Sequence, residues 1–301
     1  MSDTNIKDEA KVESKLFFSI FLNIIIVIVE MVGGFISGSL ALLSDAFHNL
    51  SDVFALIITL VTGRLTNRSP TLQHTYGLHR VKVFSALINS AVLLIVSTLI
   101  FKEAIVRFYH PQPINGLIMF WIGIVGLTAN LLSVYLLHGH SQHDMNIKGA
   151  YLHLLQDSLS SVLVVVAALF SRWRFGTYLD IIVSITILVI IGRSGWNLLR
   201  EGIHILMEGT PLGLDLGKLQ KDIQSKFPIQ SIHHIHVWEV SKGSRIMTAH
   251  IQLSELPLSE VNIILRNIHS YLAENWDIKH ATLEPENSLC QYNYINSKLQ
   301  V

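Results

Sequence analysis

Long apolar runs with almost no charge dominate the first two thirds of the sequence. The segment from residue 114 to 137 contains no charged residue, and no Lys or Arg occurs between Leu16 and Gly63. A helix rises about 1.5 Å per residue, so about 20 such residues cross the roughly 30 Å hydrocarbon core of a bilayer. The chain therefore cannot fold as one soluble domain, and we expect most of it to lie in a membrane.

Six of these runs have the length of membrane-spanning helices, about 20 residues each. They cover residues 16–36, 40–62, 81–107, 114–137, 147–171 and 177–199, with a turn predicted at Ser37-Gly38-Ser39. The polar start lacks the basic region, short apolar run and cleavage site of a signal peptide. The sequence therefore predicts an N-terminal tail over residues 1–15 and a six-helix transmembrane domain over residues 16–208.

The basic residues that flank these runs are distributed unequally. An even number of spans puts both chain ends on one side. That side carries ten Lys and Arg residues and the other side four: Lys7, Lys11, Lys15, Arg64, Arg68, Arg80, Lys82, Lys148, Arg193 and Arg200 against Lys102, Arg107, Arg172 and Arg174. The positive-inside rule then places both termini in the cytoplasm.

The amino-acid composition excludes several classes of function and of metal site. The 22 basic and 22 acidic residues balance, which argues against a nucleic-acid binder. The single cysteine, Cys290, excludes an intramolecular disulfide and a multi-thiolate zinc site. By contrast, the chain has 15 histidines, so imidazoles and carboxylates are the metal-binding groups to consider.

The sequence after Glu208 has the composition of a soluble domain. Helical spacing over 212–227 and 259–275 and β-branched strands at 231–240, 245–253 and 278–284 predict the order α-β-β-α-β, with a hairpin turn at 241–244. This order is typical of a small two-layer α+β domain. We place it at residues 209–286, followed by a loose C-terminal tail at 287–301.

Two histidine–aspartate pairs lie inside the second and fifth predicted spans. His48 and Asp52 are four residues apart, and so are His153 and Asp157, so each pair shares one helix face. A charged side chain near the bilayer centre costs roughly 2.5–3.5 kcal/mol, and neither span offers a nearby Lys or Arg to neutralise its acids. If the two faces meet, two imidazoles and two carboxylates surround one point.

Such a set suits tetrahedral Zn²⁺, and its two carboxylates balance the charge of the ion. One such pair could equally be a hydrogen bond between packed helices, but two matching pairs favour a metal. The ligands disfavour Mn²⁺ and Mg²⁺, whereas Cd²⁺, Co²⁺ and Ni²⁺ stay open as cargoes. Asp45, one turn before His48, is either an accessory ligand or, as we prefer, a helix-end residue near the membrane surface. We expect Glu30, as a buried protonated acid, to bond to a neighbouring helix, and Asn23, Asn89 and Asn130 to form hydrogen bonds between helices.

Three stretches resemble the cation diffusion facilitator family, in its zinc-exporting CzcD/ZitB-type branch. They are GSLALLSDAFHNLSD (38–52), SPTLQHTYG (69–77) and NIKGAYLHLLQDSLSSV (146–162). The resemblance covers about residues 16–286. It implies a homodimeric, six-span metal/proton antiporter with a cytoplasmic metallochaperone-like domain, and it implies that the two His–Asp pairs form the transport site.

The chain departs from the family pattern after Gly77, where Lys82 occupies a position that is usually acidic. This departure puts a metal role of that loop in doubt, with His74 left as a weak accessory ligand. In the C-terminal domain the resemblance implies regulatory metal positions at His233 or His236, at His250, and at His280 with Glu286. His234 and His236 alternate with His233 and Ile235, so a regular strand would put them on one face.

These residues predict export of Zn²⁺ driven by protons. A metal site needs neutral imidazole and ionised carboxylate, so protons compete with the ion. An intramembrane metalloprotease is disfavoured, because the chain has no HExxH motif and no open ligand position. A membrane-bound metal sensor without transport is the other alternative, and it leaves the paired intramembrane sites unexplained. The absence of a targeting peptide and the short loops favour a bacterial inner membrane.

Overall fold

The fold was examined in a computed structural model, which describes residues 21–66, 69–138, 145–173 and 175–288. The described chain forms two compact units, one within the ranges Met1–Gly63 and Ser85–Leu199 and the other within Arg64–Phe84 and Arg200–Val301. The predicted N-tail, Cys290 and almost all of the predicted C-terminal tail lie outside the described residues. Each unit is described separately below.

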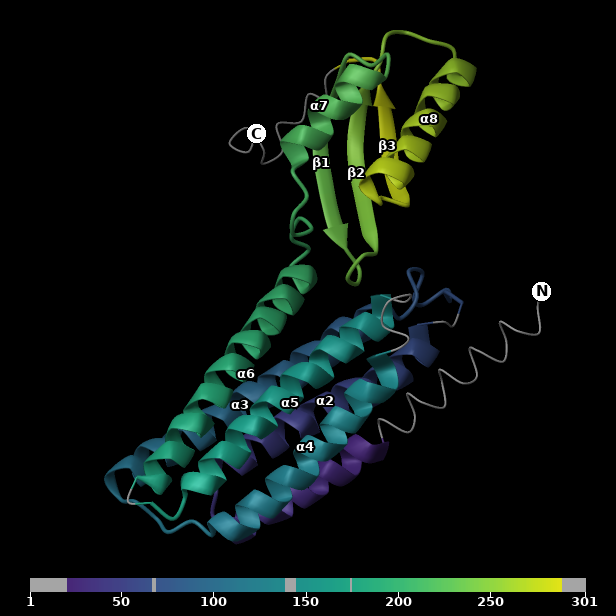
Figure 1. Ribbon diagram of the computed structural model, residues 1–301. Helices are drawn as coiled ribbons and strands as arrows, with labels where there is room; N and C mark the ends of the chain where they lie inside the picture. Colours follow the sequence, from purple (N-terminus) through teal and green to yellow (C-terminus); the bar gives the residue numbers. More distant parts are fainter. Residues whose placement is uncertain (1–20, 67–68, 139–144, 174, 289–301) are drawn as a thin grey trace, which may run out of the picture. The chain divides into compact units, whose positions relative to one another are not determined.

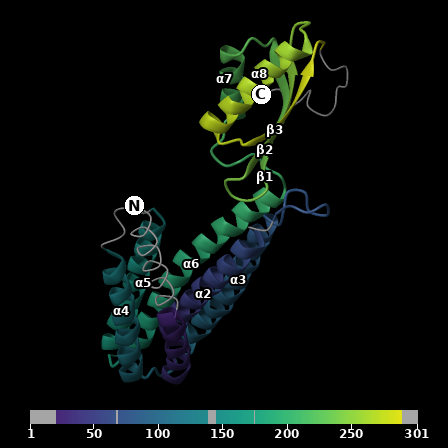
Figure 2. The same ribbon diagram turned by 90° about the vertical axis from the view of Figure 1, so that its right-hand side faces the viewer.

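The first unit is a bundle of long apolar helices (Figures 1 and 2). A helix at Phe21–Ser37 precedes α2 (Leu40–Thr66), α3 (Arg80–Tyr109), α4 (Gly116–His138), α5 (Met145–Phe170) and α6 (Gly176–Leu206). Within the described residues, five of these helices are long and apolar enough to cross a membrane, and Phe21–Ser37 is a shorter apolar helix. The prediction of a helical membrane protein is confirmed, and residues 16–20 of the first predicted span lie outside the described residues.

Apolar packing holds this bundle together. One buried cluster includes Leu42 of α2, Met119 of α4, Val164 of α5 and Ile187 of α6. Gly123 of α4 lies against α5, where an added Cβ would come within 3.0 Å of Val165 Cγ2. Small residues at such points allow helices to approach closely in a membrane.

The outward faces of the helices are also apolar. On α3, for example, Ile88, Ile95 and Leu99 are each at least 60% exposed. In water such a surface would be unfavourable, but lipid chains accept it while the backbone hydrogen bonds are satisfied within the helices. The exposed apolar surface therefore fits a multi-pass membrane protein.

The second unit contains the predicted α-β-β-α-β domain. Its elements are α7 (Leu216–Lys226), β1 (Ser231–Glu239), β2 (Arg245–Gln252), α8 (Leu258–Trp276) and β3 (His280–Glu286). The sheet has the order β1-β2-β3, with β1 and β2 antiparallel and β2 and β3 parallel. Its core consists of side chains from both helices and all three strands, among them Leu219, Ile223, Ile232, Met247, Ile251, Ile268, Leu272 and Leu283. The α+β prediction is confirmed.

Local signals explain where these elements begin and end. Asp215 caps α7, because its carboxylate accepts a hydrogen bond from the Lys218 N–H at 3.0 Å. The hairpin between β1 and β2 closes through Gly243, whose φ of 79° suits glycine. Strand β3 begins two residues later than predicted, because the Ile278 N–H is bonded to the Leu272 carbonyl at the end of α8.

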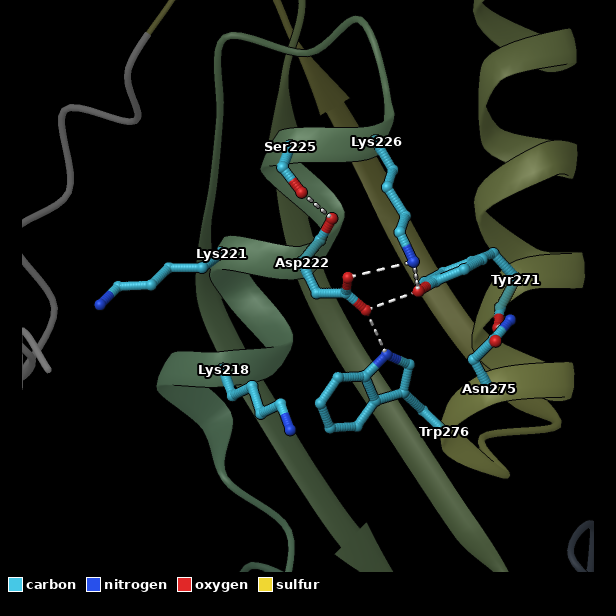
Figure 3. Close-up of a pocket in the computed structure, with 8 residues that line it drawn as sticks. All are labelled: Lys218, Lys221, Asp222, Ser225, Lys226, Tyr271, Asn275 and Trp276. Carbon is cyan, nitrogen blue, oxygen red and sulfur yellow. Dashed lines mark hydrogen bonds and ion pairs between the residues drawn. The ribbon is translucent and has the colours of Figure 1, made fainter.

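A polar contact joins the two helices of this unit (Figure 3). The Asp222 carboxylate of α7 accepts hydrogen bonds from Tyr271 Oη at 2.6 Å and from Trp276 Nε1 at 3.0 Å, and it pairs with Lys226 Nζ at 3.2 Å. These donors lower the pKa of Asp222, the Tyr271 hydroxyl most strongly. The open groove around this contact has a volume of about 660 Å³. Because three donors satisfy Asp222, we interpret the contact as a tie between α7 and α8.

Candidate metal centre

Helices α2 and α5 bring the two predicted His–Asp pairs together. His48 Nε2 lies 3.5 Å from Asp157 Oδ1, and His153 Nε2 lies 3.3 Å from Asp52 Oδ2, so each contact crosses between the helices. Within the helices, His48 Nδ1 lies 3.5 Å from Asp52 Oδ2, and His153 Nε2 lies 3.8 Å from Asp157 Oδ2. The four side chains therefore form a closed ring, here called the His–Asp cluster.

The spacing of this cluster matches that of ligands around one ion. Ligand atoms about 2.1 Å from a tetrahedral Zn²⁺ lie about 3.4 Å from one another. Ligand atoms of His48, Asp52 and Asp157 all lie within 4.8 Å of one another. The His153 ring meets the His48 ring edge-on, with centroids 6.0 Å apart, so His153 completes the set from the side.

Several atoms of the cluster lack hydrogen-bond partners. Within the described part of the chain, His48 Nδ1, Asp52 Oδ2 and Asp157 Oδ1 are buried and have none. Buried polar atoms without a partner are rare, because each one costs desolvation free energy. A divalent cation would supply the missing partner for both carboxylates at once.

The side chains of the His–Asp cluster differ in how far they are exposed. The Asp157 side chain is 4% exposed, whereas the His153 side chain is 43% exposed. His153 is therefore the most exposed member of the cluster.

Asp45 joins α2 to α5 one turn from the cluster. Its carboxylate accepts hydrogen bonds from Ser160 Oγ at 2.5 Å and from Ser161 Oγ at 3.2 Å. The side chain is buried, in the second turn of α2. Two hydroxyls satisfy this carboxylate, so in this structure Asp45 joins α2 to α5.

Asp180 is a buried acid that the sequence analysis did not single out. From α6 it accepts hydrogen bonds at the start of α2 from the N–H groups of Leu40 at 2.9 Å and Ala41 at 3.2 Å, and from Ser39 Oγ at 2.5 Å. A carboxylate at a helix N-terminus satisfies orphan N–H groups and the positive end of the helix dipole. In the sequence, Asp180 is an acid near the start of an apolar span. That position alone does not indicate which helix end its side chain contacts.

Three further polar side chains link neighbouring helices. Asn89 Nδ2 of α3 donates to Ser51 Oγ of α2 at 3.1 Å, and Asn130 Nδ2 of α4 donates to Ser161 Oγ of α5 at 3.3 Å. Glu30, in the helix Phe21–Ser37, accepts a hydrogen bond from Asn49 Nδ2 of α2 at 2.8 Å. The prediction of bonds between helices is confirmed for Glu30, Asn89 and Asn130, but among the described residues Asn23 has no such bond.

A second cluster lies on the outer face of the C-terminal sheet. His233 of β1, His250 of β2 and Glu286 of β3 could together hold a metal ion. His233 Nε2 lies 3.3 Å from Glu286 Oε2, and both atoms are buried without a hydrogen-bond partner among the described residues. The other oxygen of Glu286 contacts His250 Nδ1. Burial lowers the pKa of His233, an effect that the Glu286 carboxylate partly opposes. A lowered pKa favours the neutral imidazole that a metal needs.

The structure corrects the expected geometry of this second cluster. A β-bulge lies between His233 and His236, and His234 within it has a φ of 49°. The extra residue shifts the alternation of β1, so the His234 ring, not the exposed His236, lies beside His233 and His250, with ring centroids 5.2 and 4.9 Å apart.

His280 and His74 do not join either cluster. His280 pairs in register with Ile246, four positions along the sheet from the His250–Glu284 pair, so it lies at the other end of β3. His74 is exposed in a turn, where its N–H donates to the Thr71 carbonyl at 3.1 Å. Within the described ranges, neither belongs to a group of three possible metal ligands.

A membrane bundle with a His–Asp cluster between two of its helices, followed by a small α+β domain, defines a multi-pass membrane protein built to handle metal cations. Comparison with known proteins gives the family. Residues 16–207 match the cation efflux transmembrane domain, and residues 211–288 match the cytoplasmic domain of cation efflux proteins. The chain belongs to this family of cation transporters.

Related proteins with assigned names align with this chain over most of their length. A zinc transporter ZitB from Pectobacterium atrosepticum is 38% identical, with 96% of this chain and 90% of the relative aligned. The zinc transporter ZitB of Escherichia coli is 40% identical over 87% and 84% of the two chains. A cadmium, cobalt and zinc/H(+)-K(+) antiporter from Bacillus subtilis is 37% identical over 86% and 84%. The expected family resemblance is therefore confirmed.

Proposed function

We propose that this chain exports Zn²⁺ from the cytoplasm in exchange for protons, with the ion bound by His48, Asp52, His153 and Asp157. The spacing of the His–Asp cluster is the observation that carries the proposal. Its two contacts between the helices, 3.5 Å from His48 Nε2 to Asp157 Oδ1 and 3.3 Å from His153 Nε2 to Asp52 Oδ2, match the separation of ligands around one ion. The zinc transporter names of the two ZitB relatives support zinc as the cargo.

The same four groups also explain the exchange. Zn²⁺ binds neutral imidazoles and ionised carboxylates, so its arrival displaces protons, and protonation of the histidines weakens its binding. When the cluster faces the outside, protons expel the ion, and when it faces the cytoplasm, proton release restores affinity. In this cycle the metal is a substrate, and the protein contributes the ligands and their access.

Other soft divalent cations fit the same ligands. Imidazole and carboxylate donors disfavour Mg²⁺ and Mn²⁺, which prefer six oxygen ligands, but they accept Co²⁺, Ni²⁺ and Cd²⁺. The antiporter from Bacillus subtilis carries cadmium and cobalt in its name beside zinc. We therefore include these ions as secondary cargoes.

The proposal includes a membrane arrangement. Both termini lie in the cytoplasm, residues 16–208 form the transmembrane domain, and residues 209–286 form a cytoplasmic domain through which two copies associate. The excess of basic residues on one side of the predicted spans supports this orientation. In bacteria the protein would lie in the inner membrane.

Zinc transport into proteoliposomes that contain a pH dye tests the proposal. We expect Zn²⁺ and protons to move in opposite directions. Asp157→Ala should abolish both movements, because one carboxylate no longer balances the charge of the ion. Ser158→Ala is the matched control, since Ser158 is the next residue of α5 and bonds only to the Leu154 carbonyl of its own helix.

Two results would contradict the assignment. Full zinc transport by Asp157→Ala would exclude the His–Asp cluster as the transport site. Zinc binding by the wild-type protein without movement of zinc or protons would favour a membrane-bound sensor.

A second candidate function is regulation by metal at the C-terminal cluster. His233, His250 and Glu286 supply two imidazoles and a carboxylate, two of whose atoms are buried without partners within the described residues. We propose that cytoplasmic Zn²⁺ binds there and increases transport. In the full chain, His250→Ala should shift activation to higher zinc while leaving the maximal rate unchanged, and an unchanged zinc dependence would exclude the role.

A further inference from the structure

Glu30 is a buried acid of the membrane bundle whose side chain is only half satisfied. It lies in the helix Phe21–Ser37 and is 1% exposed. One carboxyl oxygen, Oε2, accepts the Asn49 Nδ2 hydrogen bond at 2.8 Å. The other oxygen, Oε1, is buried and has no partner among the residues that the structure describes.

Within the described ranges, no positively charged group is among those that act on Glu30. The charged groups that act on it are Asp45 of α2 and Asp157 of α5, and both are acids. On α4, Gly126 faces Oε1 so closely that an added Cβ would lie 2.3 Å from it, and residues 116–137 of that helix carry no charge. Isolated carboxylates in such surroundings are very unfavourable unless something neutralises them.

A proton on Oε1 neutralises the side chain without another residue. We propose that Glu30 is a proton-binding site of the transport cycle, separate from the four metal ligands. This inference rests on the proposed zinc/proton exchange. It adds to that exchange a proton that is bound away from the ion.

Electrostatics couple this proton to the metal. Zn²⁺ in the His–Asp cluster places a double positive charge beside Asp157, which is one of the two acids that act on Glu30. An opposite charge nearby favours the ionised carboxylate, so the metal-free protein holds the proton and the zinc-bound protein releases it. When the proton is released, the Glu30 O–H bond breaks, its electron pair stays on the carboxylate, and the proton passes to water.

A purely structural role for Glu30 makes a different prediction. In that case the only contribution of Glu30 to the protein is its hydrogen bond with Asn49. Glu30→Gln keeps the oxygen that accepts this bond and keeps the size of the side chain, but it cannot bind or release a proton. Glu30→Asp keeps an acid but withdraws it from Asn49 by one methylene group.

The test counts protons released when the detergent-solubilised full chain binds Zn²⁺, in a weakly buffered solution with a pH dye. Relative to wild type, Glu30→Gln should release about one proton fewer per chain at zinc saturation and should still bind the ion. Glu30→Asp should retain the release. Glu103→Gln is the matched control, because this acid of α3 is partly exposed, pairs with Arg107 at 2.8 Å and should release as wild type does.

The outcomes separate this inference from the proposed function. An unchanged proton count in a Glu30→Gln protein that binds zinc would overturn the role of Glu30, whatever the fate of the transport assignment. Equal losses in Glu30→Gln and Glu30→Asp would also overturn it, because geometry and not titration would then be responsible. Failure of the wild-type protein to bind zinc, or normal binding by Asp157→Ala, would instead overturn the His–Asp cluster.

Discussion

Removal of the Asp180 carboxylate tests how the start of α2 is held. Asp180 reaches from α6 to the N–H groups of Leu40 and Ala41 and to the Ser39 hydroxyl. Leu40 and Ala41 are at most 2% exposed, so after the change to alanine neither water nor another side chain takes over their bonds. We expect Asp180→Ala to destabilise the bundle and to loosen the helix that carries His48 and Asp52.

The size of the effect follows from the groups that lose a partner. Each buried N–H left without an acceptor costs about 1–3 kcal/mol, so two of them cost about 2–6 kcal/mol. The two N–H groups bond to different oxygens, so Asp180→Asn keeps an acceptor for one of them and should cost about 1–3 kcal/mol. The matched control is Ser184→Ala, which removes a neutral hydrogen bond of 2.7 Å to Ser44 between the same two helices and should cost about 0.5–1.5 kcal/mol.

Thermal unfolding of the detergent-solubilised protein, followed by the loss of helical circular dichroism, measures this ranking. The expected order of melting temperatures is wild type, then Ser184→Ala and Asp180→Asn close together, then Asp180→Ala. Zinc affinity should fall in Asp180→Ala as well, since the end of α2 that precedes the ligands is no longer fixed. If Asp180→Ala melted with Ser184→Ala and bound zinc normally, the proposed support of α2 by α6 would be wrong.

Three further predictions concern the C-terminal unit and use a fragment of residues 209–288, which has its own hydrophobic core. In zinc titration calorimetry, His233→Ala or His250→Ala should weaken zinc binding by more than about tenfold, or about 1.4 kcal/mol. His280→Ala should leave zinc binding unchanged. The reverse pattern would exclude His233 and His250 as zinc ligands. Because hydrogen bonds hold the pKa of Asp222 below its ordinary value, the ionised Asp222 stabilises the fold above the unfolded pKa of about 3.9, and this stability is lost as the pH falls through the lower folded pKa. Asp222→Asn should therefore flatten the acid limb of the stability curve, and an unchanged limb would argue against the tie between α7 and α8. Leu272→Ala, at a fully buried position of α8, should cost about 2–5 kcal/mol in urea unfolding, and a loss below about 1 kcal/mol would contradict the packing described.

Structural features that depend on a sequence pattern repeating within a few residues could be predicted from the sequence. The spacing of His48 and Asp52, and of His153 and Asp157, places each pair on one helix face whatever the rest of the chain does. Apolar length alone predicted the long helices, and turn residues predicted the hairpin at 241–244. These features depend on geometry that repeats within a few residues.

Features that depend on pairing between distant segments could not be predicted in this way. The bulge at His234 breaks the two-residue period of β1, so regular alternation, which puts His234 and His236 on one face, does not predict that only the His234 ring lies beside His233 and His250. The parallel register of β2 and β3 sets the distance of His280 from His250, and no local pattern encodes that register. The contact of Asp180 with the start of α2 likewise joins residues about 140 positions apart, where the sequence gives only an unpaired acid.

The hydrogen bonds between Asp45 and the serines of α5 also constrain movement. They join α2 to α5 one turn from the proposed ligands. In the proposed transport cycle the two helices would therefore move as one unit, with the four ligands kept together. Exposure of the ion to opposite sides of the membrane would then require movement at the contacts of this pair with other helices. Among these contacts are those with α6 through Asp180 and Ser184, with α3 through Asn89 and with α4 through Asn130.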